Sequence, residues 1–202
     1  MTDIAIVLLA AGSSTRMRRP KQLLPWDEVT LIEFQLKKLS KLNYPVYVVL
    51  GSAADEILQH ITNYEVRIVI NENWKSGMGT SVSAGMHQVF ADLPKSKAVM
   101  YALIDQPLVS TLHLQKLIDS FVPGQEQIVV SRSEDGWLGV PALYDSTYFS
   151  ELEKLTGESG AKTLIKKYPE KVLAIDAGDS LKDMDTQDSY KKLLEEFKFK
   201  FK

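Results

Sequence analysis

Two cations and a run of small residues follow the first apolar segment of the chain. Ile4–Leu9 leads into a turn containing Gly12, and Arg16 and Lys21 follow closely. Small residues let a backbone approach a ligand, Gly12 tolerates unusual φ and ψ angles, and the N–H groups of such a turn can point at phosphate oxygens. Fixed positive charge nearby would strengthen phosphate binding. The G-x-G-x-x-G and Walker patterns are absent, so composition alone equally allows an ordinary connection with two solvated cations.

A carboxylate follows the apolar run Ala98–Leu103, in the sequence Ile-Asp-Gln-Pro that contains Asp105. The carboxyl ends of parallel strands meet at one edge of a sheet, so Asp105 is expected beside the first loop. Magnesium prefers oxygen ligands, often one or two carboxylates plus substrate phosphates. Asp105 therefore suits a magnesium site, although an Asp that caps a helix is an equally ordinary alternative.

A second group of acids lies near the carboxyl terminus, where Asp185 is followed by Thr186. Asp185 or Thr186 could simply cap the last helix, because acidic and hydroxyl residues are common at helix starts. Asp183 and Asp188 are expected to be solvated or to act as caps.

A Gly- and Ser-rich segment, Gly77–Gly85, occupies the middle of the chain. Thr80 or Ser81 could cap the following helix, whose free N–H groups would suit a ribose, a base edge or a phosphate. Ser83 is close to a nucleophile elbow, which would make the protein a hydrolase that uses His113. That reading is weak, because the elbow should directly follow a strand. The three histidines are scattered along the sequence, so a histidine metal site is not expected.

Apolar runs that alternate with helical patterns must position these residues. The expected strands are Ile4–Leu9, Val46–Leu50, Val66–Ile70, Ala98–Leu103, Ile128–Ser131 and Val172–Ile175. Helical spacing marks Leu31–Leu42 and Leu112–Phe121, the latter with Ser110 or Thr111 as its cap, and a hairpin is expected at Trp137–Tyr144. This alternation predicts an α/β fold with three α/β/α layers and a mostly parallel, Rossmann-like sheet. We expect one domain at residues 1–194 and a charged, aromatic tail at 195–202, either a frayed helix end or an edge strand.

The overall composition excludes several classes of function. The 202 residues are 45% hydrophobic and 25% charged, with a net charge of -2, which gives no support to a nucleic-acid or membrane partner. The absence of cysteine excludes disulfides, thiolate metal sites and cysteine nucleophiles. The amino terminus has no basic segment or apolar run of signal-peptide length, so a cytoplasmic location is expected.

The first loop resembles the signature of the MobA-like nucleotidyltransferases. The resemblance rests on Leu-Ala-Ala-Gly-Ser-Ser-Thr-Arg-Met at residues 9–17 and Pro-Lys-Gln-Leu-Leu-Pro at 20–25. It extends through the Asp-Gln-Pro turn, the Gly-Met-Gly-Thr-Ser segment and the Asp-Met-Asp-Thr ending, from about Ile4 to Tyr190. Ala11 before Gly12 is more similar to the molybdenum cofactor cytidylyltransferase branch, because the guanylyltransferase branch tends to have Gly there.

The resemblance implies a fold of the nucleotide-diphospho-sugar transferase type and a specific reaction. CMP would pass from Mg-CTP to the phosphate of a molybdopterin-type cofactor, with a molybdoenzyme or its maturation factor as a further partner. Asp105 and Asp185 would hold Mg²⁺, and Arg16, Lys21 and Asp105 would be catalytic. The nucleotide would contact Leu9, Ala10, Ala11, Gly12, Ser13, Ser14, Thr15, Arg16, Lys21, Gly79, Thr80, Ser81 and Asp105.

One departure from the family pattern keeps two alternatives open. Arg18 stands where the family usually has Gly, and a side chain there could crowd the triphosphate or add a cation to it. The alternatives are a guanylyltransferase of the same family and a non-catalytic assembly factor that binds the nucleotide or cofactor.

Overall fold

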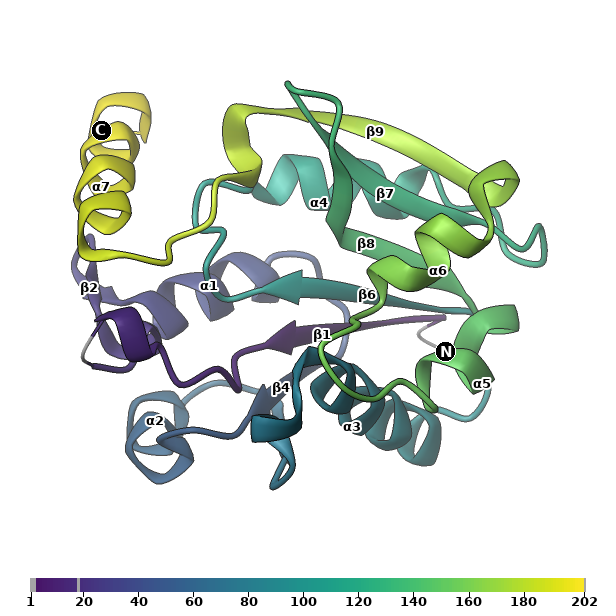
Figure 1. Cartoon of the computed structure of the whole chain (residues 1–202), viewed down its shortest axis with the longest axis horizontal. Helices are drawn as coiled ribbons and strands as arrows, with labels where there is room; N and C mark the ends of the chain where they lie inside the picture. Colours follow the sequence, from purple (N-terminus) through teal and green to yellow (C-terminus); the bar gives the residue numbers. More distant parts are fainter. Residues whose placement is uncertain (1–2, 18, 202) are drawn as a thin grey trace.

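A seven-stranded, mostly parallel sheet forms the centre of the computed structural model, which describes residues 3–17 and 19–201 (Figure 1). The strand order is β5-β4-β1-β6-β8-β7-β9, and β8 is the one strand that pairs antiparallel to its neighbours. The strands are β1 (Ile4–Leu9), β4 (Val46–Leu50), β5 (Arg67–Ile70), β6 (Ala98–Leu103), β7 (Ile128–Ser133), β8 (Leu138–Asp145) and β9 (Val172–Gly178). A separate two-stranded ribbon joins β2 (Pro25–Trp26) to β3 (Val29–Thr30).

The continuous apolar character of the central strands follows from burial on both faces of the sheet. All six residues of β1 and all five of β4 are buried. Alternate side chains of β1 enter two different cores, with Ile6 and Leu8 on one side and Ala5 and Val7 on the other. The expected bounds of β1, β4 and β6 are confirmed, and β7 and β8 form the expected hairpin.

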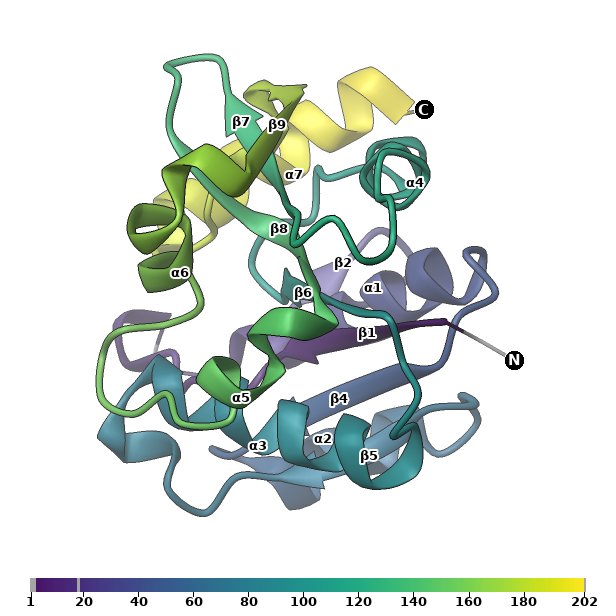
Figure 2. The same ribbon diagram turned by 90° about the vertical axis from the view of Figure 1, so that its right-hand side faces the viewer.

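Helices cover both faces, which confirms the three-layer α/β/α prediction. Side chains of α1, α2 and α4 belong to one core, and those of α3, α5 and α6 to the other. Figure 2 shows α5 and α6 on the opposite side of the sheet from α1 and α4. The helices are α1 (Leu31–Ser40), α2 (Ala54–Ile61), α3 (Met78–Asp92), α4 (Thr111–Asp119), α5 (Phe149–Leu152), α6 (Lys162–Lys167) and α7 (Gln187–Phe201).

Side-chain hydroxyl groups accept backbone hydrogen bonds at the starts of α1, α4 and α7. Thr30 and Glu33 form a reciprocal capping box at α1. The Ser110 hydroxyl accepts a hydrogen bond from the backbone N–H of His113 at α4, so Ser110 is the cap of the two candidates. At α7, the Thr186 hydroxyl accepts from the N–H of Ser189 at 3.1 Å, which agrees with the capping alternative for that residue.

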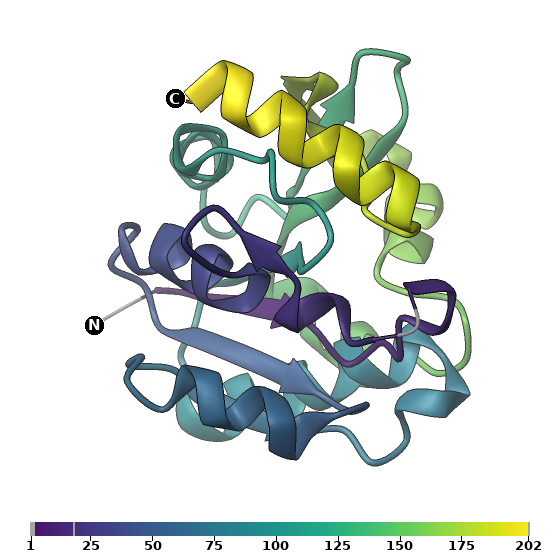
Figure 3. The same cartoon turned by 90° about the vertical axis from the view of Figure 1, so that its left-hand side faces the viewer.

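The residues expected to form a tail continue α7 instead. Because α7 runs unbroken to Phe201, the edge-strand alternative for 195–202 is wrong. The buried ring of Phe197 lies 5.5 Å from Trp26 and 5.2 Å from Phe34, between ring centroids. Figure 3 shows α7 beside β2 and α1. The Phe–Lys alternation thus places one aromatic ring on the body of the protein. Among the described residues, no helix is both long and apolar enough to span a membrane.

Candidate functional site

The principal site is a cavity of about 480 Å³ at the carboxyl ends of β1 and β6. Strand order reverses at this pair, because β4 follows β1 on one side and β6 lies on the other. Open α/β sheets bind ligands at such a switch point. In Figure 1 the chain between β9 and α7 descends toward this edge, and the N–H of Met184 donates to the carbonyl of Asp105 at 2.9 Å. The cavity is lined by Leu9, Ala11, Gly12, Ser13, Lys21, Trp74, Lys75, Gly77, Met78, Ser81, Leu103, Ile104, Asp105, Glu158, Asp183 and Asp185.

The first loop is held in shape by its own side chains. The buried Gln22 amide donates to the carbonyls of Ala10, at 2.6 Å, and Gly12, at 3.1 Å. The Ser14 hydroxyl accepts from the backbone N–H of Lys21 at 3.0 Å. Ser14 takes a left-handed conformation with φ 52°, whereas Gly12 is not among the glycines with positive φ. No atom lies within 4 Å of where a Gly12 side chain would be, so this part of the loop opens onto free space.

An ammonium group joins the two carboxylates expected to bind metal. The Nζ of Lys21 lies 2.6 Å from Asp105 Oδ2 and 3.1 Å from Asp185 Oδ1. Burial works to lower the pKa of Lys21, but the charges and hydrogen bonds of both acids raise it above its usual value. Burial works to raise the pKa of Asp185, but Lys21 and Arg16 lower it. Arg16 completes the group with a 3.0 Å ion pair to Asp185 Oδ2.

These residues fit a divalent cation. Asp105 Oδ1 is buried and has no hydrogen-bond partner among the described residues, which leaves it free to act as a ligand. The other oxygen of Asp105 and one oxygen of Asp185 already converge on a single cationic nitrogen. Hard oxygen ligands with this convergence suit Mg²⁺ or Mn²⁺. The Asp105 alternative as a helix cap is wrong, because α4 is capped by Ser110.

Asp183 is exposed, which agrees with the expectation of a solvated acid, but it also contacts the site. Its Oδ1 accepts a hydrogen bond from the Gln106 amide at 3.0 Å, and the residue lines the cavity. Burial and the charge of Asp105 raise the pKa of the Asp183 carboxyl, although the Gln106 hydrogen bond opposes the shift. Asp183 was missed because its position two residues before Asp185 suggests nothing of the Gln106 contact.

The glycines of the middle segment serve close packing against the chain around Gly157. Gly77 has φ 106°, and a side chain on it would meet the Gly157 carbonyl. The N–H of Gly79 donates to the same carbonyl oxygen at 2.8 Å. A side chain on Gly79 would meet Thr156 and Ser159. The Gly79 N–H is thus occupied by protein.

Thr80 and Ser81 lie inside α3, so the expectation that one of them caps the helix is wrong. The helix begins at Met78, and Gly77 occupies the cap position without a side-chain bond. The amide of buried Asn71 donates to both hydroxyls at 2.9 Å. Ser81 lines the cavity, whereas Thr80 does not.

The structure separates the expected nucleotide contacts into two groups. Those that line the cavity are Leu9, Ala11, Gly12, Ser13, Lys21, Ser81 and Asp105. Those that do not line it are Ala10, Ser14, Thr15, Arg16, Gly79 and Thr80. Arg18 lies outside the described residues. Trp74 and Glu158 also line the cavity.

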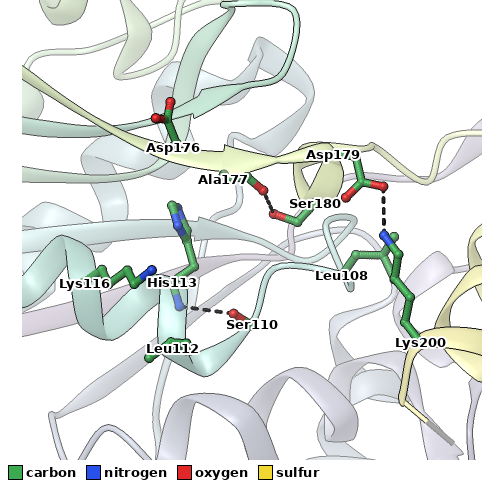
Figure 4. Close-up of a pocket in the computed structure, with 10 residues that line it drawn as sticks. All are labelled: Leu108, Ser110, Leu112, His113, Lys116, Asp176, Ala177, Asp179, Ser180 and Lys200. Atoms are coloured by element: carbon green, nitrogen blue, oxygen red, sulfur yellow. Dashed lines mark hydrogen bonds and ion pairs between the residues drawn. The ribbon is translucent and has the colours of Figure 1, made fainter.

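The hydrolase alternative is wrong on geometry. Ser83 lies in the middle of α3 and donates to the Glu153 carbonyl, so it is not on a strand-to-helix elbow. His113 lies beneath the other face of the sheet, where its Nε2 is 2.8 Å from Ser131 Oγ. Figure 4 shows His113 in a separate cavity of about 260 Å³, with Lys116, Asp176 and Lys200. Burial and Lys116 lower the pKa of this histidine.

Comparisons with known proteins identify the family of the chain. The family described as MobA-like NTP transferase domain matches residues 6–172. Nicotine blue oxidoreductase of Paenarthrobacter nicotinovorans is 32% identical over 197 residues, which cover 93% of this chain and 95% of that protein. The molybdenum cofactor cytidylyltransferase of Escherichia coli (strain K12) is 29% identical over 90 residues, which cover 44% and 47% respectively.

Solved structures match along nearly the whole chain. Rv0371c from Mycobacterium tuberculosis H37Rv is 32% identical with a TM-score of 0.82, covering 96% of this chain and 98% of that one. Its complex with manganese is 31% identical with a TM-score of 0.76, covering 96% and 99%. A nucleotidyl transferase from Methanothermobacter thermautotroptrophicus shares the fold at 22% identity, with a TM-score of 0.82 and coverage of 97% and 98%.

Proposed function

Because the chain belongs to the MobA-like NTP transferase family, we propose that it transfers CMP from Mg-CTP to the phosphate of a molybdopterin-type cofactor. The chain is a nucleotidyltransferase; the base, the metal and the acceptor constitute the proposal. One observation carries it: Lys21 joins Asp105 and Asp185 at the edge of the cavity, beneath the open first loop. The cytidylyltransferase relative supports the pterin acceptor, and the cytoplasmic location and molybdoenzyme partner belong to the same proposal.

The reaction requires positioning and charge neutralisation more than proton transfer. An acceptor phosphate oxygen attacks the α-phosphorus and forms a new P–O bond, while the bond to the β-phosphate oxygen breaks and pyrophosphate leaves. The attacking phosphate is already anionic, so no strong general base is needed. The backbone around Gly12 would hold the triphosphate, and Lys21 and Arg16 would offset charge that grows on the leaving pyrophosphate.

Asp105 and Asp185 would hold the metal. The unpaired Oδ1 of Asp105 and the oxygens now facing Lys21 supply the ligand set. A bound Mg²⁺ would neutralise phosphate charge and orient the oxygens of the triphosphate. The structure of Rv0371c in complex with manganese supports the binding of a divalent ion. Displaced from the carboxylates, Lys21 would then be available to the triphosphate.

The test is release of pyrophosphate from each of the four nucleoside triphosphates, with Mg²⁺ and the pterin acceptor. We expect CTP to be the best substrate and Asp105→Asn to lower turnover by at least about 100-fold. Asp188→Asn, an exposed acid three residues after Asp185, is the matched control and should retain wild-type turnover. Near-normal turnover of Asp105→Asn would refute the metal assignment. A preference for GTP would indicate the guanylyltransferase alternative, and binding without turnover would indicate the assembly factor.

A second candidate activity for the same cavity is oxidoreduction. It is favoured by one observation, the 32% identity to nicotine blue oxidoreductase across nearly all of both chains. On this reading the cavity would take nicotine blue, the compound in that relative's name, as the molecule that is oxidised or reduced. A change in the absorbance of nicotine blue that depends on the protein, without pyrophosphate release from any triphosphate, would favour oxidoreduction over nucleotidyl transfer.

A further inference from the structure

Side chains of α1 donate hydrogen bonds to backbone carbonyls of the turn that contains Asp105. Residues 103–109 run from the end of β6 to α4, and most of their carbonyl groups are hydrogen-bonded outside a regular strand or helix. The Asp105 carbonyl accepts from the Met184 N–H at 2.9 Å, and the Gln106 carbonyl accepts weakly from the Val109 N–H at 3.4 Å. The remaining bonds come from side chains of α1.

Gln35 holds the first part of this turn. Its Nε2 donates to the carbonyls of Leu103, at 3.2 Å, and Ile104, at 3.1 Å. Only 3% of the residue is exposed. The contact spans 68 and 69 residues of sequence, so it fixes α1 directly against the residues that precede Asp105.

Lys38, one helical turn further along α1, holds the second part. Its Nζ donates to the carbonyls of Val109, at 2.7 Å, and Pro107, at 3.3 Å. The remaining face of the amine lies 5.5 Å from the centre of the Phe34 ring. Burial lowers the pKa of Lys38 to about 7, with no carboxylate charge among the described residues to offset it.

A buried amine of this kind needs an explanation, because desolvating it without an ionic partner costs stability. A methionine of similar length would fill the space without that penalty. What the amine adds is donors: two carbonyls of the turn face it, and an unpaired buried carbonyl is itself costly. Even the neutral amine has two N–H groups, so both protonation states can serve both carbonyls.

We propose that Gln35 and Lys38 form a clamp that sets the position of Asp105 and therefore the geometry of its metal site. They are positioning residues, since neither lines the nucleotide cavity. The clamp acts on backbone carbonyls on both sides of Asp105, so losing it frees the turn without removing a ligand. The inference rests on the proposed function for its catalytic consequence but not for its effect on the turn.

The experiment compares Lys38→Met with Lys37→Met. The control removes the exposed lysine that immediately precedes Lys38 in α1. Gln35→Met is a second test variant. Amide hydrogen exchange is followed by mass spectrometry for residues 104–109 and, as an internal reference, for residues 82–89 in α3. Manganese binding is measured by the electron paramagnetic resonance of free Mn²⁺, and turnover is measured by pyrophosphate release.

In Lys38→Met we expect exchange at 104–109 to rise about tenfold with the reference segment unchanged. Manganese should bind about tenfold more weakly, and kcat should fall about 10- to 100-fold with less than about a threefold change in the KM for nucleotide. Lys37→Met should match the wild type throughout. Unchanged exchange at 104–109 in Lys38→Met and Gln35→Met, or unchanged manganese affinity, would overturn the clamp. A wild type that releases no pyrophosphate would refute the proposed function, while exchange and manganese binding would still decide on the clamp.

Discussion

Replacing Lys21 by methionine should make the stability of the protein depend on a divalent metal. The side chain is 10% exposed, and its partner Asp105 is 17% exposed, so this pair is largely buried. Breaking a buried pair by removing one partner costs about 3–5 kcal/mol, and the lower figure applies at this exposure. Asp185 is 39% exposed, so water screens its pair, which adds less than about 1 kcal/mol. We therefore expect Lys21→Met to lose about 3 kcal/mol.

Thermal unfolding in EDTA and in excess Mg²⁺ measures this effect. For a domain of this size, about 3 kcal/mol corresponds to a melting temperature lower by roughly 6–12 °C. The variant leaves the largely buried Asp105 without the ammonium, while Asp185 keeps its ion pair with the exposed Arg16, and a divalent ion would replace the lost ammonium. Metal at about 100 times its dissociation constant returns about 2.7 kcal/mol, so most of the loss should be recovered. The wild type, whose Lys21 must be displaced, should gain less.

The pH dependence follows from the two pKa shifts. The raised pKa of Lys21 contributes stability that is present below its unfolded value and lost as pH rises through its folded value. The lowered pKa of Asp185 contributes stability that is present above its unfolded value and lost as pH falls through its folded value. The difference in the free energy of unfolding between wild type and Lys21→Met should thus stay constant from about pH 5 to 9 and become smaller at acidic pH. Equal melting temperatures in EDTA, or equal stabilisation of both proteins by metal, would refute the reasoning.

Three further outcomes are expected. Ala11→Gly should raise kcat/KM for GTP relative to CTP by about tenfold, because a methyl group on the cavity wall can bar a purine edge; an unchanged ratio would contradict the role of Ala11. The free energy of unfolding of the wild type relative to Lys38→Met should rise by up to about 1.4 kcal/mol per pH unit between pH 7 and 10, because the folded pKa of Lys38 is about 7 and its ordinary value is 10.5. Chemical denaturation at several pH values checks this, and a level difference would contradict burial of the amine. Arg18→Gly should change turnover by less than about tenfold, since a long side chain can stay in solvent, and a gain of several orders of magnitude would mark the natural protein as an impaired enzyme.

The central strands could be predicted because each is a continuous run of apolar residues, the pattern typical of strands that are buried on both faces. β1, β4 and β6 each consist of an unbroken apolar run, since both faces of each strand meet a core. The start of α3 was not predictable in this way. Gly77 takes a conformation that ends the preceding turn early, and the reason is a contact with Gly157, which lies 80 positions away along the chain.

The types of the site residues were predictable, but their partners were not. The carboxylates at 105 and 185 were expected to converge, yet Lys21 was expected to face phosphate alone. Its contacts span 84 and 164 residues and depend on how the last connection crosses the sheet. Lys38 carries no signal at all, because a lysine on a helix is ordinarily a solvated one. Such partners become visible only when the elements are packed.

Because β8 runs antiparallel to β6, it brings the β7–β8 hairpin to the edge of the sheet that carries the cavity. Tyr101 pairs with Ala142 and Ala98 with Asp145, so β8 starts at the edge where β1 and β6 end. The hairpin before Leu138 therefore reaches the active edge although it belongs to the far half of the sheet. Insertions or substitutions in the turn between β7 and β8 would therefore change the surface beside the cavity where a second substrate could bind. Such changes leave the first loop and the strands β1 and β6 unaltered, because the hairpin belongs to β7 and β8.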